Sequence, residues 1–220
     1  MERAALGVFF WLVCACSSGG GGAGGASDAG LDAAGGSGGA TPDSGGASGS
    51  GGASGAGGAV GNPVVEFETS LGTMAIELDP ERLPVTTANF LSYVDEGFYS
   101  GTIFHRVIPG FVIQGGGFQS GLVPKATKPP IALEIHPEVK HGYGAISMAR
   151  TSLPDSATSQ FFLVNNPAGA PGLDGDYAAF GSLIEGSAVL DAISAVPTTT
   201  QGTYQDVPVT EVVVLSAQRR

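Results

Sequence analysis

The fold of this chain is decided by residues 104–116, which read FHRVIPGFVIQGG. This stretch contains most of one short β-rich apolar run, residues 103–107, and all of a second, residues 111–114. Apolar runs of this length are typical of strands rather than of helices. Two short strands are therefore predicted close together in the chain.

Further strand patterns lie on both sides of this stretch. Residues 64–69 alternate between apolar and polar side chains, and residues 70–72 connect them to a second β-rich run, residues 73–78, which predicts a hairpin. The other predicted strands are residues 131–135, 144–149, 160–164, 180–184 and 209–215.

Two helices are predicted among these strands. Pro84 and Gly97 bracket the first, at about residues 85–96, and the second covers residues 187–195. The residues of the first helix expected to face inward are Val85, Ala88, Leu91 and either Tyr93 or Val94. Many short strands without a regular strand–helix alternation favour a mainly β fold, a closed antiparallel barrel.

The chain divides into three parts by composition. Residues 1–16 resemble a signal peptide. The apolar run at residues 4–13 has the length of the hydrophobic region of such a peptide and is too short to span a bilayer. Residues 17–62 hold 20 glycines in 46 residues, mixed with Ala and Ser, and are expected to form a flexible linker. Residues 63–220 have ordinary globular composition and are predicted to form one domain.

The end of the apolar run is similar to a bacterial lipobox. Cys16 follows Ala15, a small residue, and Val13 stands three residues before it, as in that signal, whereas Cys14 fits the pattern poorly. We therefore expect lipidation at Cys16, export, and a lipid anchor as the only membrane attachment. Ser17 favours the outer membrane over the inner membrane, and leaves open which face the domain occupies.

Composition and motifs exclude several kinds of function. The chain has 9 Lys and Arg against 20 Asp and Glu, a net charge of −11 without a basic cluster, which argues against nucleic-acid binding. Both cysteines precede residue 17, so the domain has no thiol nucleophile. Residues 35–39 match G-x-S-x-G by composition only, and residues 115–117 lack the Lys of a phosphate loop.

The three histidines lack metal-ligand spacing, although a three-histidine zinc site remains an alternative. If the protein is an enzyme, its reaction is therefore expected to need no nucleophile, metal or redox cofactor.

Residues 104–116 resemble the active-site signature of the cyclophilins. Three further blocks, residues 147–150, 159–162 and 173–181, are similar to later blocks of that family in the same order. The likeness runs from about residue 64 to 215 and is strongest to the bacterial periplasmic branch. It implies an eight-stranded barrel capped by two helices. It also implies peptidyl-prolyl cis-trans isomerase activity, a rotation about an amide bond that needs no nucleophile.

The resemblance also implies roles for individual residues. Arg106 matches the donor to the prolyl nitrogen, and the implied substrate-binding residues are Phe111, Val112, Gln114, Ala149, Arg150, Gln160, Phe162, Leu173 and Tyr177. Without the motif, the aromatic residues could be core residues, and Arg106 a surface charge or an ion-pair partner of Glu134. His105 is expected to be structural rather than a proton donor.

Two rim positions depart from the well-known eukaryotic members of the family. Gly172 stands where Trp is common and Tyr177 where His is common, so we expect weak cyclosporin binding. The expected partners are proline-containing polypeptides, the expected state is a monomer, and the expected role is folding of exported or cell-envelope proteins. A non-catalytic proline-peptide-binding module is the alternative, and a purely structural surface lipoprotein would leave the matching site residues unexplained.

Overall fold

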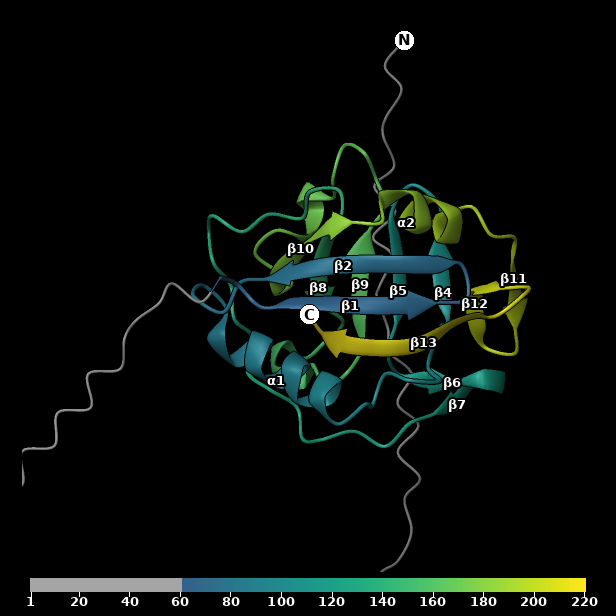
Figure 1. Ribbon diagram of the computed structural model, residues 1–220, viewed down its shortest axis with the longest axis horizontal. Helices are drawn as coiled ribbons and strands as arrows, with labels where there is room; N and C mark the ends of the chain where they lie inside the picture. Colours follow the sequence, from purple (N-terminus) through teal and green to yellow (C-terminus); the bar gives the residue numbers. More distant parts are fainter. Residues whose placement is uncertain (1–60) are drawn as a thin grey trace, which may run out of the picture. The chain divides into compact units, whose positions relative to one another are not determined.

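The structure is a computed structural model that describes residues 61–220 (Figure 1). The predicted lipidation site Cys16 and the predicted linker up to residue 60 lie outside the described residues. The strands are β1 Val64–Thr69, β2 Gly72–Leu78, β3 Ile103–Phe104, β4 Arg106–Ile108, β5 Val112–Gly115, β6 Phe118–Gln119, β7 Val123–Pro124, β8 Ala145–Met148, β9 Phe161–Val164, β10 Ala179–Glu185, β11 Thr198–Gln201, β12 Tyr204–Pro208 and β13 Val212–Arg219. The helices are α1 Pro84–Asp95 and α2 Ser187–Ser194, with 3₁₀ turns at Ser120–Leu122, Pro154–Ser156 and Pro171–Leu173.

Nine strands form one antiparallel sheet in the order β3-β13-β1-β2-β10-β8-β9-β5-β4. The two end strands, β3 and β4, are consecutive in the chain and are separated only by His105. Residues 103–108 therefore pair with β13 through their first half and with β5 through their second half. Counted as one bent strand, this segment completes an eight-stranded barrel, which confirms the predicted mainly β architecture.

The barrel core is rich in aromatic side chains. Phe161 packs edge-on against Phe90 of α1 with ring centroids 5.7 Å apart, and against Tyr99 at 5.4 Å. Leu190 and Ile193 of α2 are fully buried in the same cluster. Both helices thus contribute apolar side chains to the core, which is the main source of stability in such a fold.

Most predicted elements are present, but the short strands β6, β7, β11 and β12 were not predicted, and two predictions are wrong. Residues 131–135 do not form a strand, because only Ile131 makes a β-bridge, to Ala157. The buried face of α1 also differs from the prediction: Thr86, Thr87 and Phe90 are buried there, while Val85 is 49% exposed. Leu91, Tyr93 and Val94 are buried as predicted, and Ala88 is exposed.

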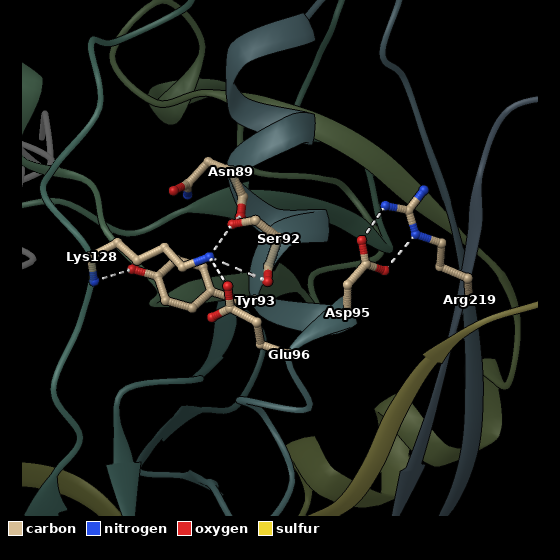
Figure 2. Close-up of polar contacts among 7 residues, drawn as sticks. All are labelled: Asn89, Ser92, Tyr93, Asp95, Glu96, Lys128 and Arg219. Carbon is tan, nitrogen blue, oxygen red and sulfur yellow. Dashed lines mark hydrogen bonds and ion pairs between the residues drawn. The ribbon is translucent and has the colours of Figure 1, made fainter.

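Helix α1 is anchored from both sides by charged side chains (Figure 2). The ammonium group of Lys128 donates to the Ser92 hydroxyl at 2.9 Å and to the Glu96 carboxylate at 2.7 Å. Arg219 of β13 makes a two-point pair with the Asp95 carboxylate at 2.7 and 2.6 Å. These contacts hold the helix between the loop before β8 and the last strand.

No helix within the described range is both long and apolar enough to cross a membrane.

Candidate functional site

Cross-strand register separates an inner and an outer row of side chains on β4, β5, β9 and β8. The inner row consists of Val107, Ile113, Leu163 and Ile146, all of which are buried in the barrel core. Because side chains alternate between the faces of a strand, the neighbouring row points away from that core. The candidate site therefore lies on the outside of the barrel wall.

The outer row carries the predicted catalytic residue. Arg106 on β4 is paired with Gln114 on β5, and Gln114 is paired with Phe162 on β9. Directly opposed residues in a sheet have neighbouring side chains. The register thus places the guanidinium, an amide and a benzyl side chain in one line across three adjacent strands.

An apolar cluster surrounds Phe162 and is distinct from the barrel core. Val112 and Phe162 are almost completely buried in it. Six of the predicted site residues belong to this cluster or pack against it: Phe111, Val112, Ala149, Phe162, Leu173 and Tyr177. The Tyr177 ring meets the Phe162 ring edge-on at 5.7 Å. The structure therefore brings the predicted apolar residues together around one ring.

The predicted polar residues lie around this cluster. The Gln114 side-chain amide donates to Oε1 of Gln160 at 2.9 Å, and both residues are buried. Arg150 lies over the Tyr177 ring, 4.6 Å from its centroid, and its Nε donates to the carbonyl oxygen of Asp176 at 2.8 Å. Gly172 is exposed, and a Cβ added there would meet no atom within 4 Å.

Arg106 is half-buried and has one carboxylate beside it. Its side chain is 15% exposed, and its Nε lies 3.8 Å from Oδ2 of Asp206 on β12. Burial lowers the pKa of Arg106 from its ordinary value, and the negative charge of Asp206 opposes that change. A guanidinium remains charged even so, because its ordinary pKa is far above neutral.

Glu134 is not the partner of Arg106, since its carboxylate accepts from the backbone N–H groups of Val85 and Thr86.

His105 is buried behind the outer row. Burial and the neighbouring Arg106 charge lower the pKa of this imidazole to about 3, so it is neutral at physiological pH. Its Nδ1 has no hydrogen-bond partner within residues 61–220, and its ring packs on Phe118 at 4.6 Å. These surroundings agree with the structural role expected for His105, because a neutral imidazole is a poor general acid near pH 7.

A second histidine supports the apolar cluster from beneath. The His141 ring stacks on Phe162 at 6.0 Å, its Nδ1 lies 2.8 Å from Asp174, and its Nε2 lies 3.1 Å from the Ser147 hydroxyl. This arrangement has the residue types of a hydrolase triad, but Ser147 is fully buried and cannot reach a substrate. The group instead ties the segment that carries Leu173 to β8.

Several of these residues were not found from the sequence. Asp206 lies 100 residues after Arg106, and only the placement of the β11–β12 hairpin brings it close. Asp174 belongs to the similar block at residues 173–181, but its contact with His141 has no sequence signal. Across the portion that the structure describes, no three His, Cys, Asp or Glu side chains gather as metal ligands.

Comparisons with known proteins agree with this geometry. Residues 64–219 match the family model "Cyclophilin type peptidyl-prolyl cis-trans isomerase/CLD". A peptidyl-prolyl cis-trans isomerase of Acinetobacter baylyi is 49% identical over 160 residues, which are 71% of this chain and 85% of the relative. Peptidyl-prolyl cis-trans isomerase B of Escherichia coli is 44% identical, covering 70% of this chain and 97% of the relative.

A solved structure extends the likeness to three dimensions. The cyclophilin type isomerase of Cryptosporidium parvum, crystallised in the presence of the dipeptide Ala-Pro, aligns with a TM-score of 0.62 at 30% identity. The alignment covers 71% of this chain and 98% of that protein. Sequence, barrel topology and relatives lead to one conclusion: this chain belongs to the cyclophilin-type family of peptidyl-prolyl cis-trans isomerases.

Proposed function

We propose that this isomerase uses Arg106 as its catalytic residue. Rotation about an X–Pro bond faces a barrier of roughly 18–20 kcal/mol, because the amide has partial double-bond character. A guanidinium N–H directed at the prolyl nitrogen stabilises the twisted state, in which the nitrogen lone pair is localised. That interaction is weak in either planar ground state, so it lowers the barrier rather than merely binding the substrate.

The observation that carries this proposal is the register Arg106–Gln114–Phe162. The partly exposed side chains of Phe111, Leu173 and Tyr177, which pack around the buried Phe162, offer an apolar surface for the proline ring. Adjacent strands are about 4.8 Å apart, so Arg106, two strands away, lies about 10 Å from Phe162 along the sheet. An extended arginine side chain can span much of that separation.

The remaining predicted residues would hold the substrate backbone. Gln114 and Gln160 form a buried amide pair, and amides both donate and accept hydrogen bonds. Ala149 directly follows β8, and we propose that residues 149–150 pair with the main chain of the peptide. In this arrangement Arg150 is already held against Tyr177, so little side-chain entropy is lost when the peptide binds.

The decisive experiment is exchange NMR on a short Ala-Pro peptide with wild type, Arg106→Ala and Arg106→Lys. Loss of a donor that acts in the transition state typically costs about 10²- to 10³-fold in rate, and we expect that loss in Arg106→Ala. Arg106→Lys keeps the charge without the planar fork and should fall between the two. Full turnover in Arg106→Ala would contradict the assignment.

A proline-peptide-binding module is the second candidate, favoured only by the exposed Gly172 at the rim. The same NMR titration distinguishes the two. Chemical-shift changes on peptide addition without any acceleration of cis–trans exchange in the wild type would indicate binding alone.

We further propose that the enzyme is exported, is lipid-anchored through Cys16 and assists folding of exported or cell-envelope proteins. The support is the lipobox-like sequence before Ser17 and the glycine-rich residues 17–62. Metabolic labelling with a radioactive fatty acid, followed by fractionation, should label the wild type in the membrane fraction. Cys16→Ser should be unlabelled, whereas Cys14→Ser should remain labelled; label retained in Cys16→Ser would overturn the assignment.

A further inference from the structure

Asp206 has an unusual backbone conformation for its residue type. Its φ is +59°, and within residues 61–220 Leu122 is the only other non-glycine residue with positive φ. Thr199 pairs with Val207 and Gln201 with Tyr204, so β12 holds one more residue than β11 between these pairs. An extra residue of this kind forms a β-bulge, which redirects a side chain out of the regular alternation.

The bulge directs the Asp206 carboxylate toward Arg106. The distance from Oδ2 to Nε is 3.8 Å, an ion pair without a hydrogen bond. The Asp206 side chain is 37% exposed, against 15% for Arg106. Of the two opposite charges, the carboxylate is therefore the more accessible to a bound polypeptide.

The hairpin that carries Asp206 is fixed to the site by packing. The Tyr204 ring meets Phe118 edge-on at 5.4 Å, and Phe118 packs in turn on His105, the residue before Arg106. Val207, the residue after Asp206, is 2% exposed. These contacts hold the β12 backbone beside β4, as Figure 1 shows.

We propose that Asp206 determines substrate specificity by charge. A lone guanidinium in the site would attract acidic side chains of the substrate and repel basic ones. Asp206 cancels that field and presents its own negative charge at the more exposed position, so polypeptides with Lys or Arg next to the proline are favoured. Glu and Asp in the same place are disfavoured. This inference rests on the proposed role of Arg106.

The selectivity is confined to one side of the proline. The other cation of the site is Arg150, which lies over the Tyr177 ring. That ring packs on Phe162, and Phe162 is two strands away from Arg106 along the outer row. Substrate residues on that side are closer to Arg150 than to Asp206. A basic residue is thus favoured on the Arg106 side only.

The test is kcat/KM by exchange NMR for a peptide series with Lys, Gln or Glu at each position flanking one Ala-Pro bond. Exposed charge pairs are worth about 0.2–1 kcal/mol, so we expect a Lys-to-Glu ratio of roughly 1.4- to fivefold at one flank in the wild type. The ratio should fall toward one in 0.5 M salt, because the Debye length is then much shorter.

Two variants remove the charge without straining the bulge. Asp206→Asn is nearly isosteric and Asn tolerates positive φ, and Asp206→Gly keeps the backbone conformation without a side chain. In both variants the Lys-to-Glu ratio of kcat/KM should fall to one or below one. Glu77→Gln on β2, in the middle of the strand order and far from β4, changes the net charge equally and should preserve the ratio.

The outcomes separate this inference from the proposed function. An unchanged Lys-to-Glu ratio in Asp206→Asn, or a wild type indifferent to charge at every flanking position, would overturn the role of Asp206. Arg106→Ala measured on the Gln peptide reports on the catalytic assignment alone. If Arg106→Ala is inactive and Asp206→Asn keeps the wild-type Lys-to-Glu ratio, the isomerase mechanism is supported and only the specificity proposal is rejected.

Discussion

A Cβ atom at Gly117 would stand 2.5 Å from the Cγ and Nε2 atoms of Gln160. Glycine at this position therefore makes room for the side chain that accepts the hydrogen bond from Gln114. The three glycines at residues 115–117, which lack the companions of a phosphate loop, have a packing role here instead. The absence of a side chain at Gly117 therefore determines where the Gln160 amide can lie.

We expect Gly117→Ala to displace Gln160 and break its hydrogen bond with Gln114. A net hydrogen bond is worth about 0.5–1.5 kcal/mol, which corresponds to a loss of roughly two- to tenfold in kcat/KM. The displaced atoms belong to the flexible end of a side chain, so the unfolding midpoint should change little. Gly142→Ala, where a Cβ meets nothing within 4 Å, is the matched control. Unaltered kinetics in Gly117→Ala would contradict the proposed role of the amide pair.

Acid should destabilise the fold partly through His105. Its pKa is lowered to about 3 in the folded protein, against about 6.5 when unfolded, so below pH 6.5 the unfolded state binds a proton that the folded state excludes. Lowering the pH from 7 to 5 should therefore cost about 2 kcal/mol from this residue, at 1.36 kcal/mol per pH unit below 6.5.

Urea unfolding of wild type and His105→Gln at both pH values measures this effect. The loss of stability between pH 7 and 5 should be smaller by that amount in the variant, whatever its absolute stability. Equal pH dependence in His105→Gln and wild type would show that His105 is not buried as a neutral group.

Glu134 should stabilise helix α1 from outside the helix. The N-cap residue Leu83 offers no side-chain cap, and the Glu134 carboxylate accepts from the N–H groups of Val85 and Thr86 at 3.1 and 2.6 Å. A carboxylate there also interacts favourably with the helix dipole. Glu134→Ala should lower the free energy of unfolding by about 1 kcal/mol, the usual value of an N-cap.

Thermal and urea unfolding check this prediction, with Glu138→Ala as the control. The Glu138 side chain is 71% exposed and only pairs with Arg82 at 3.5 Å, so its loss should be nearly neutral. Similar effects of the two substitutions would mean that the long-range cap contributes nothing.

Cyclosporin should bind weakly, with a dissociation constant above about 1 μM. Gly172 is exposed with open space around its Cβ position, so Gly172→Trp should fold normally and restore a large flat surface with an N–H donor. We expect about tenfold tighter cyclosporin binding in this variant, equivalent to about 1.4 kcal/mol. Sub-micromolar binding by the wild type in a calorimetric titration would refute the expectation.

The sequence predicted the barrel strands well because they are short, apolar and β-branched, and the motif placed Phe111, Phe162 and Tyr177 in one cluster. It failed on α1, where apolar character suggested Val85 inward; the structure instead buries the small Thr86 and Thr87 next to Phe90. At residues 131–135 an apolar pattern has no strand beside it to pair with beyond one bridge.

Contacts across long stretches of chain were not predictable. The β11–β12 hairpin is polar, and nothing in its composition indicates a bulge at Asp206 or its approach to Arg106. The same holds for His141, whose partner Asp174 lies in the loop after β9 and whose partner Ser147 lies on β8. Local patterns specify elements, whereas these contacts depend on how the completed elements meet.

The pairing of β3 with β13 has a consequence for the order of events during synthesis. Phe104 and Ile103 pair with Val212 and Val213, so the segment that carries Arg106 lacks its neighbour until the last strand has been made. Strand β1 also lacks one of its two neighbouring strands until then, because it lies between β2 and β13. A nascent chain therefore holds an incomplete barrel, and we expect isomerase activity only after translation has reached β13.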